Sequence, residues 1–125
     1  MILLTVDEII DFHKRLIEAT GGSSEMRDSS LLESAVYNAI QSFDDEEIYK
    51  SVEEKAARLA FAIIKNHAFV DGNKRIGAFV MLITLQLNSV PIMFTQQELI
   101  TLGVSIAESA MSYIEILAWI NSHKT

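Results

Sequence analysis

The sequence repeats one helix-start signal, the capping box, at intervals of helix length. In a capping box a Ser or Thr side chain bonds the backbone amide three residues later, and a Glu or Gln at that position bonds back. The pattern occurs at Thr5/Glu8, Ser30/Glu33, Ser51/Glu54 and Thr95/Glu98. Apolar residues at helical spacing follow each box, and strand-like alternation is scarce. We therefore predict an all-α fold, a compact single-domain bundle of about six helices over residues 1–125.

Turn and breaker residues set the ends of the predicted helices. Gly21-Gly22 ends the first helix, and the Asn88–Pro91 segment ends the fourth. The segment IGAFVMLITLQL is apolar on most faces, which is typical of a central, buried helix. The predicted helices cover Val6–Ala19, Ser30–Ser42, Val52–Asn66, Asn73–Leu87, Gln96–Ala107 and Tyr113–Asn121.

Composition excludes several classes of protein. The 125 residues contain no cysteine, which rules out disulfides and thiolate metal sites and fits a reducing compartment. No apolar run reaches the roughly 18 residues that span a bilayer. The N-terminus lacks the basic region of a signal peptide, so we expect a cytoplasmic protein with no membrane partner. A net charge of −7 argues against general nucleic-acid binding, which needs a basic face.

One segment is not explained by burial, caps and turns: HAFVDGNKR, residues 67–75, between the third and fourth predicted helices. From Lys65 to Arg75 the chain carries three basic residues and one aspartate, a local charge of +2, whereas the remainder carries −9. A basic island on an acidic protein suggests a small anionic ligand. Lys74 and Arg75 also fall in a helix's first turn, where a cation costs about 0.3–1 kcal/mol. The four capping-box helices carry Glu there, so an anion is the expected missing partner.

The residue types of this segment suit a phosphate-bearing ligand. Backbone amides of Gly72, Asn73 and Lys74, together with the helix dipole, would form a phosphate site. Glycine lets a phosphate approach the backbone closely, and Lys74 and Arg75 add charge-assisted hydrogen bonds.

Three further residues of the segment have predicted roles. Asp71 supplies the hard oxygen ligand that a divalent cation accompanying polyphosphate requires. His67 is the side chain whose ordinary pKa suits a general base near neutrality. Phe69, between them, is expected to point into the core and support the loop.

Each of these residues also has an ordinary structural explanation. His67 could cap the third helix, Asp71 could be an N-cap, and Gly72 could serve a turn. A zinc site from His67 and Asp71 lacks an evident third ligand. No phosphate-binding loop of the GxxxxGK[ST] type occurs in the chain.

HAFVDGNKR resembles the HxFx[DN][AG]NKR motif of the Doc (death-on-curing) branch of the Fic superfamily, and every defined position matches. The resemblance covers nearly the whole chain. LTVDEIIDFHKRLIEATGG with MRDSSLLESAVYNA is similar to the family's N-terminal half, and IYKSVEEKAARLAFAIIKNHAFVDGNKRIGAFVMLITLQLN to its centre. It implies a small helical Fic core that uses ATP and Mg²⁺ to modify a hydroxyl group on a protein.

Two positions separate this motif from that of the superfamily's AMP transferases, HxFx[DE]GNxRxxR. Lys74 replaces a residue that is commonly glycine there, and Ala78 replaces their second arginine. Both departures are those of the Doc branch, in which the nucleotide binds turned around and the γ-phosphoryl group is transferred. The resemblance therefore implies a protein kinase. An AMP transferase and a catalytically inactive module that binds an antitoxin as a corepressor remain the alternatives.

The resemblance also assigns roles to residues and partners to the protein. It makes His67 the base for the target hydroxyl, Asp71 the metal ligand, Arg75 a phosphate ligand, and Gly72, Asn73 and Lys74 the lining of the anion hole. The implied target is a hydroxyl of a translation elongation factor, so that translation is inhibited. The implied partner is a small antitoxin whose flexible tail folds on binding, and we expect it to need an apolar groove formed by the N-terminal helices.

Residues His13, Arg27 and Asp28 also fit the family's N-terminal pattern. We expect structural roles for them: Asp28 beside the Ser30 cap with Arg27 as its partner, and His13 on a partly exposed helix face.

Two longer segments have predictions of their own. Ser29–Glu33 is close to the superfamily's self-inhibitory [ST]xxxE[GN] pattern, but Ser34 follows it, so we interpret it as a helix cap. Gln41–Tyr49 is expected to form a flap that holds the target as an extended strand.

Overall fold

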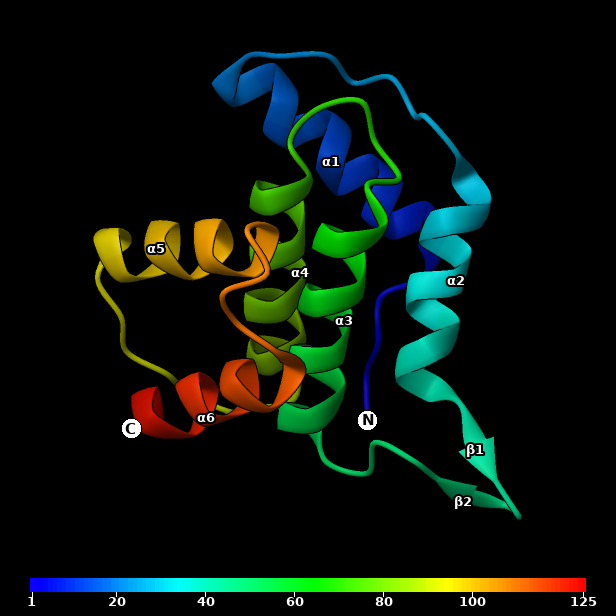
Figure 1. Cartoon of the computed structure of the whole chain (residues 1–125), viewed down its shortest axis with the longest axis vertical. Coiled ribbons are helices and arrows are strands. Elements are labelled where there is room, and N and C mark those ends of the chain that lie inside the picture. Colours follow the sequence, from blue (N-terminus) through cyan, green and yellow to red (C-terminus); the bar gives the residue numbers. More distant parts are fainter.

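The computed structural model describes residues 1–125 and confirms the all-α prediction (Figure 1). Its helices are α1 (Val6–Thr20), α2 (Ser29–Ile40), α3 (Val52–Asn66), α4 (Asn73–Leu87), α5 (Gln96–Ala107) and α6 (Tyr113–His123). A short antiparallel hairpin, β1 (Ser42–Phe43) and β2 (Glu46–Glu47), joins α2 to α3. The predicted helix ends agree with these bounds to within two residues. No helix combines the length and apolar character that crossing a membrane requires.

Local capping chemistry explains where most helices begin. The capping boxes predicted at Thr5/Glu8, Ser51/Glu54 and Thr95/Glu98 are present. The box predicted at Ser30 is wrong, because Asp28 is the N-cap of α2 and accepts hydrogen bonds from both the amide and the hydroxyl of Ser30. A further box, Ser112/Glu115, begins α6 and follows the same Ser-x-x-Glu pattern.

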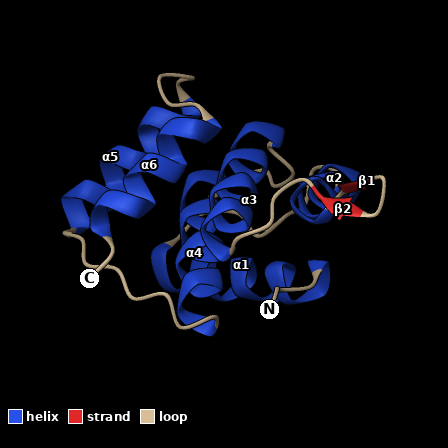
Figure 2. Cartoon of the chain, turned by 90° about the horizontal axis from the view of Figure 1, so that it is seen from below, coloured by secondary structure: helices blue, strands red, loops and turns tan.

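Helices α3 and α4 form the centre of the molecule, with α1 and α2 on one side and α5 and α6 on the other (Figures 1 and 2). The two central helices approach closely because Gly77 of α4 faces α3. A Cβ atom at Gly77 would lie 2.5 Å from Cγ1 of Ile64. Buried apolar residues then pack on both sides of this pair, in one cluster with α1 and α2 and another with α5 and α6.

The hairpin lies at the N-terminal end of α3, beside α2 (Figure 1). Lys55 of α3 holds it there: the residue is 2% exposed, and its ammonium group donates to the Glu47 carboxylate (3.1 Å) and to the Tyr49 carbonyl. Residues 67–75 begin at the opposite end of α3, and the rise along the helix from Lys55 to His67 is about 18 Å at about 1.5 Å per residue. The expected flap, Gln41–Tyr49, is therefore a hairpin that does not border that segment.

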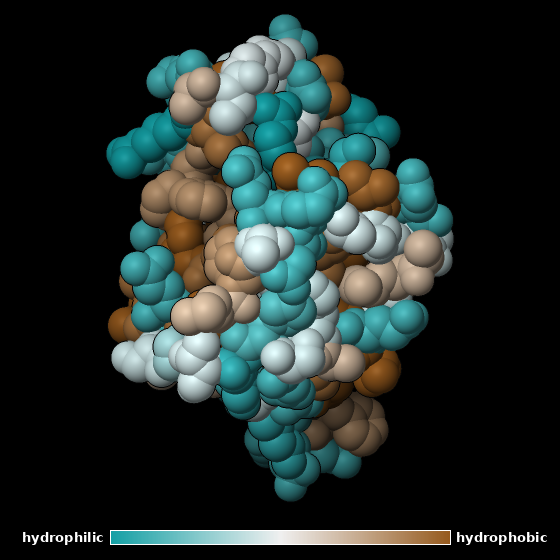
Figure 3. All heavy atoms as spheres, turned by 90° about the vertical axis from the view of Figure 1, so that its left-hand side faces the viewer, coloured by the Kyte–Doolittle hydropathy of each residue, from teal (hydrophilic) through white to brown (hydrophobic).

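An apolar groove of about 610 Å³ lies along α4. Phe79, Leu82 and Ile83 line one wall, and Pro91, Ile92 and Phe94 of the connection to α5 line the other. We call it the α4 groove. On the side of the molecule that carries α5 and α6, apolar side chains gather around a recess (Figure 3). The groove is formed by α4 and the segment after it, not by the N-terminal helices where we expected one.

Candidate active site

Two left-handed residues turn the chain between α3 and α4. His67, the C-cap of α3, has φ 54° and ψ 49°, and Gly72, the N-cap of α4, has φ 77°. A left-handed histidine is uncommon and needs support from its surroundings. Arg27 supplies that support, because its guanidinium group donates to the carbonyls of His67 (2.8 Å) and Asn66 (3.2 Å). Hydrogen bonds from Ser30 lower the pKa of Asp28 and the Arg27 charge adds to this, but the hydrogen bonds of the Arg27 guanidinium go to the last carbonyls of α3.

The side chain of His67 is free. The residue is exposed, and its ring makes no hydrogen bond within the chain. The backbone of His67 ends the helix, so the imidazole is left available to a ligand. His67 can therefore be both the C-cap of α3 and the predicted general base, because the cap uses only its backbone.

The loop between the two helices is clamped by the segment before α2. The amides of Arg27 and Asp28 both donate to the Ala68 carbonyl, at 2.8 and 3.0 Å, and the Val70 amide donates to the Glu25 carbonyl at 3.0 Å. Met26 and Phe69 form an isolated antiparallel bridge. Residues 25–28 thus lie beside the loop, whereas the hairpin lies at the other end of α3.

Asn73 secures the same loop from within. Its side-chain oxygen accepts from the Phe69 amide (3.1 Å), and its side-chain nitrogen donates to the Phe69 carbonyl (2.9 Å). Asn73 is 7% exposed and Phe69 2%. The amide side chain of Asn73 is consumed by this clamp, which leaves only its backbone N–H for an anion.

His13 lies beneath the loop. It is 1% exposed, stacks on the Phe69 ring with centroids 3.7 Å apart, and places Nε2 2.7 Å from the Asp71 carbonyl oxygen. Burial lowers the pKa of His13, the hydrogen bond to Asp71 opposes that shift, and the Arg75 charge adds to it. A neutral ring that donates from Nε2 fits this setting.

The expectation that His13 is partly exposed is wrong, and the sequence held a signal against it. His13 stands between Ile9 and Ile17 at helical spacing, and all three are buried on one face of α1. A polar residue in the middle of an apolar stripe is predicted to be buried, and a buried polar side chain needs a hydrogen-bond partner from elsewhere in the chain.

Asp71 presents a carboxylate at the surface. Its side chain is 49% exposed; Oδ1 accepts from the Gly72 amide (2.9 Å) and lies 3.8 Å from Arg75, and Oδ2 accepts from the Ser23 amide (3.4 Å). No group of three His, Cys, Asp or Glu side chains is placed to hold a metal. A single carboxylate suits Mg²⁺, which takes its other ligands from phosphates and water. The same finding disfavours the zinc alternative, which needs more protein ligands.

The N-terminus of α4 is the one helix start without a side-chain cap, since the other five each have one. The first intrahelical bond is donated by Ile76 to the Gly72 carbonyl (2.9 Å). The amides of Asn73, Lys74 and Arg75 therefore point forward without an acceptor. The Gly72 amide, which we expected in this set, donates to Asp71 instead. Three aligned donors without acceptors at a helix N-terminus are suited to an anion.

Gly72 makes this turn possible. A Cβ atom there would lie 2.9 Å from Cδ1 of Ile17 and 3.4 Å from Nε2 of His13, and the residue has a left-handed φ. Both the conformation and the space require glycine.

The two cations flank the free amides differently. Lys74 is exposed and forms no ion pair. Arg75 is half-buried; it donates to the Thr20 hydroxyl and to the Gly21 carbonyl (3.3 Å) at the end of α1. Lys74 is thus the cation free to meet an anion, whereas Arg75 also fastens the first helix to the site.

An exposed histidine, a carboxylate and an uncapped helix N-terminus flanked by cations lie within one loop, a combination of groups that suits a phosphate-bearing ligand. Residues 3–85 match the Fic/DOC family, and the chain belongs to it. The match includes the whole of residues 67–75. The resemblance on which the sequence prediction was based is thereby confirmed.

The sequence is also similar to that of one particular toxin. The chain is 40% identical over 57 residues to Toxin Doc of Mycolicibacterium smegmatis. The aligned part is 46% of this chain and 44% of that toxin, so the chain matches less than half the length of its relative. This similarity supports the Doc branch of the family.

Proposed function

We propose that this chain is a Doc-type toxin that transfers the γ-phosphoryl group of ATP to a Ser or Thr hydroxyl of a protein. The observation that carries the proposal is the uncapped N-terminus of α4, where three backbone amides without acceptors and the unpaired Lys74 are available to bind an anion. The family membership and the toxin relative support the class of activity. A translation elongation factor is the proposed target, and inhibited translation the proposed outcome.

The transfer asks the chain for one base and for electrostatic stabilisation. The target hydroxyl oxygen forms a bond to the γ-phosphorus as the bond to the β,γ-bridging oxygen breaks, and ADP leaves. His67 accepts the hydroxyl proton, since its ring is exposed and carries no other hydrogen bond. The amides of Asn73, Lys74 and Arg75 and the Lys74 ammonium group stabilise the charge on the transferring group.

Asp71 is the residue that would hold Mg²⁺. The metal would supply positive charge that neutralises the phosphates of ATP during transfer. Asp71 is oriented by hydrogen bonds from Gly72 and Ser23, and His13 fixes the carbonyl of the same residue. Arg75 keeps the loop next to α1 and adds positive charge beside the phosphates.

Residues 23–27, rather than the hairpin, are the proposed guide for the target. They run beside the catalytic loop through the Met26–Phe69 bridge, and Ser24 and Glu25 are exposed. An extended target segment can add to such an edge by backbone hydrogen bonds.

The α4 groove is the proposed binding site of an antitoxin. Its walls are mostly apolar, so it suits the apolar face of a helix that folds on binding. This refines the expected site, since it moves from the N-terminal helices to α4 and the segment that follows it.

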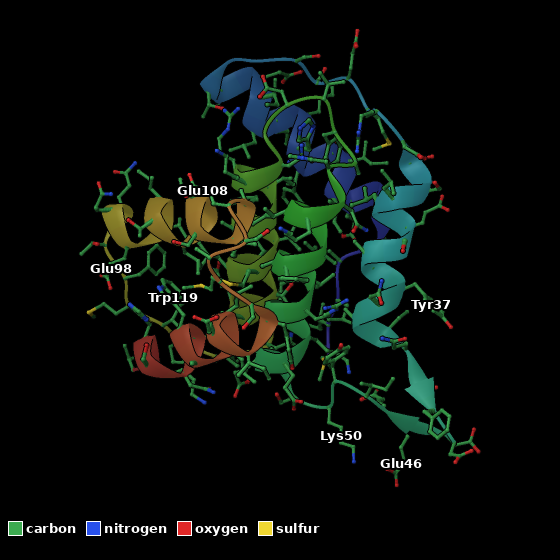
Figure 4. All side chains as sticks on the ribbon, in the orientation of Figure 1. Tyr37, Glu46, Lys50, Glu98, Glu108 and Trp119 are labelled. Carbon is green, nitrogen blue, oxygen red and sulfur yellow. The ribbon has the colours of Figure 1, made fainter.

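The test uses ATP labelled at the γ- or the α-phosphate, with purified translation elongation factor and with bacterial lysate. We expect γ-label on the protein target with the natural chain and none with His67→Ala. Label from the α-phosphate would instead favour the AMP transferase, and no His67-dependent label from either would favour the inactive module. Lys74→Ala should lose transfer, and Lys50→Ala is the matched control because Lys50 is an exposed lysine at the far end of the molecule (Figure 4).

A further inference from the structure

Residues 123–125 hold one wall of the α4 groove. The Met93 amide donates to the His123 carbonyl at 2.8 Å, and the Thr125 amide donates to the Pro91 carbonyl at 3.1 Å. Ile92 and Lys124 form the antiparallel bridge between these two segments. Because Pro91 and Ile92 line the groove, its outer wall is a strand-like segment whose backbone pairs with residues 123–125.

The side chain of His123 ties this tail to α5. Its Nε2 lies 2.5 Å from Oε2 of Glu98, and its Nδ1 lies 2.7 Å from the Trp119 carbonyl oxygen. Figure 4 shows Glu98 and Trp119 in the region where α5 and α6 face each other. The Glu98 pair thus links the tail to the first turn of α5, directly after the groove wall.

Both ring nitrogens of His123 face hydrogen-bond acceptors. A carboxylate oxygen and a carbonyl oxygen can only accept, so each nitrogen must carry a proton to bond them. The Ser122 hydroxyl, 3.1 Å from Nδ1, itself donates to the Trp119 carbonyl and is left to accept. The geometry therefore fits the imidazolium cation and not the neutral ring, in contrast to His13.

The other groups around His123 favour the same charge state. The Trp119 ring stacks on it with centroids 4.0 Å apart, a position in which an aromatic face attracts a cation. The charged groups nearby are Glu98 from α5 and the adjacent Lys124, whose ammonium group pairs with Glu53 of α3 at 3.0 Å. The segment 91–94 carries no titratable side chain.

We propose that residues 123–125 and the Glu98–His123 ion pair form a proton-dependent clasp on the outer wall of the α4 groove. Protonated His123 holds Pro91–Met93 in place, and loss of that proton breaks one of the two ring contacts and loosens the wall. The proposal concerns the shape of the groove and does not depend on the enzymatic activity proposed above.

The pH window follows from the direction of two pKa shifts. The Glu98 carboxylate and the Trp119 carbonyl raise the pKa of His123 above its ordinary 6.5, so the clasp is closed below pH 6.5 and is lost as the pH rises through the raised value. Hydrogen bonds from His123 and Thr95 lower the pKa of Glu98 below its ordinary 4.5, so its contribution is lost only when the pH falls through that lowered value. The clasp is therefore strongest between these two limits.

The test measures the protonation of the His123 ring and the stability of the groove wall separately. Nitrogen-detected NMR of the His123 ring, together with the fluorescence of Trp119, the chain's single tryptophan, follows protonation. Amide exchange at Met93 and Thr125, expressed as protection factors, follows the wall. We expect a doubly protonated ring below the midpoint, and protection that falls by about threefold to fivefold between about pH 5.5 and about pH 8.5, the scale of a part-exposed charged hydrogen bond.

Two variants decide whether the pair is responsible. Glu98→Gln, which keeps the side chain's shape, should lower the His123 midpoint and reduce protection of both amides at about pH 5.5. Asp11→Asn is the control, because it breaks the exposed Asp11–Arg15 ion pair (2.9 Å) on α1 and should change neither. A neutral His123 across this range, or protection that does not vary with pH in the natural chain, would overturn the proposal.

Discussion

Replacing Asn73 by alanine should destabilise the whole fold, although the residue stands in a motif read as catalytic. Its side chain makes two hydrogen bonds to the backbone of Phe69 and is almost fully buried. Alanine would leave a buried N–H and a buried C=O without partners, at about 1–3 kcal/mol each. Some relief by water is expected, so we predict a total loss of about 2–4 kcal/mol.

Asn73→Asp separates the two bonds. A carboxylate can accept from the Phe69 amide but cannot donate to the Phe69 carbonyl, and its charge is favoured at a helix N-terminus. Because the second carboxylate oxygen would face the Phe69 carbonyl oxygen in a buried site, the aspartate variant should lose at least as much stability as the alanine variant.

Urea unfolding followed by far-UV circular dichroism measures both losses as changes in midpoint at constant slope. A loss below about 0.5 kcal/mol for Asn73→Ala, the size of an ordinary surface substitution, would refute the reasoning. It would mean that the loop keeps its shape without the clamp.

Three further predictions concern single residues. Gly77→Ala should destabilise the fold by about 1–3 kcal/mol in urea unfolding, because its Cβ would overlap Ile64 and force the central helices apart. Lys74→Ala should abolish phosphoryl transfer yet stabilise the fold by about 0.3–1 kcal/mol, because it removes a cation from a helix N-terminus; equal or lower stability would contradict that account. His13→Phe should weaken the acid sensitivity of the fold, measured as unfolding free energy against pH. Because the pKa of His13 is lowered, the natural chain loses stability as the pH falls below 6.5, and phenylalanine removes that proton uptake. Unchanged acid sensitivity would show that His13 is not held neutral.

The helix boundaries could be predicted from the sequence because the interactions that set them are local. Capping boxes join residues three apart, and glycine and proline act on their own backbone. The error at Ser30 has the same origin, since Asp28 and Ser30 compete for one helix start and only the backbone conformation of Asp28 decides between them.

The sequence could single out residues 67–75 as the candidate site, but it could not predict which contacts each of them makes within the fold. The cations in the first turn of α4 pointed to an anion, and the structure agrees that this start lacks a cap. The sequence could not tell that the Asn73 side chain serves the loop, or that the Gly72 amide is taken by Asp71. Each of these depends on how a six-residue turn closes.

By itself, then, the sequence determined the fold class and the helices, because they follow from contacts within a few residues, and it predicted the residues of the candidate site from a contiguous motif. Only the tertiary structure decided what supports the site. His13 meets Asp71 across 58 residues and Arg27 meets His67 across 40. The Glu98–His123 contact and the displacement of the hairpin to the far end of α3 are of the same kind. Such partners are chosen by how helices pack against one another, which no local pattern records.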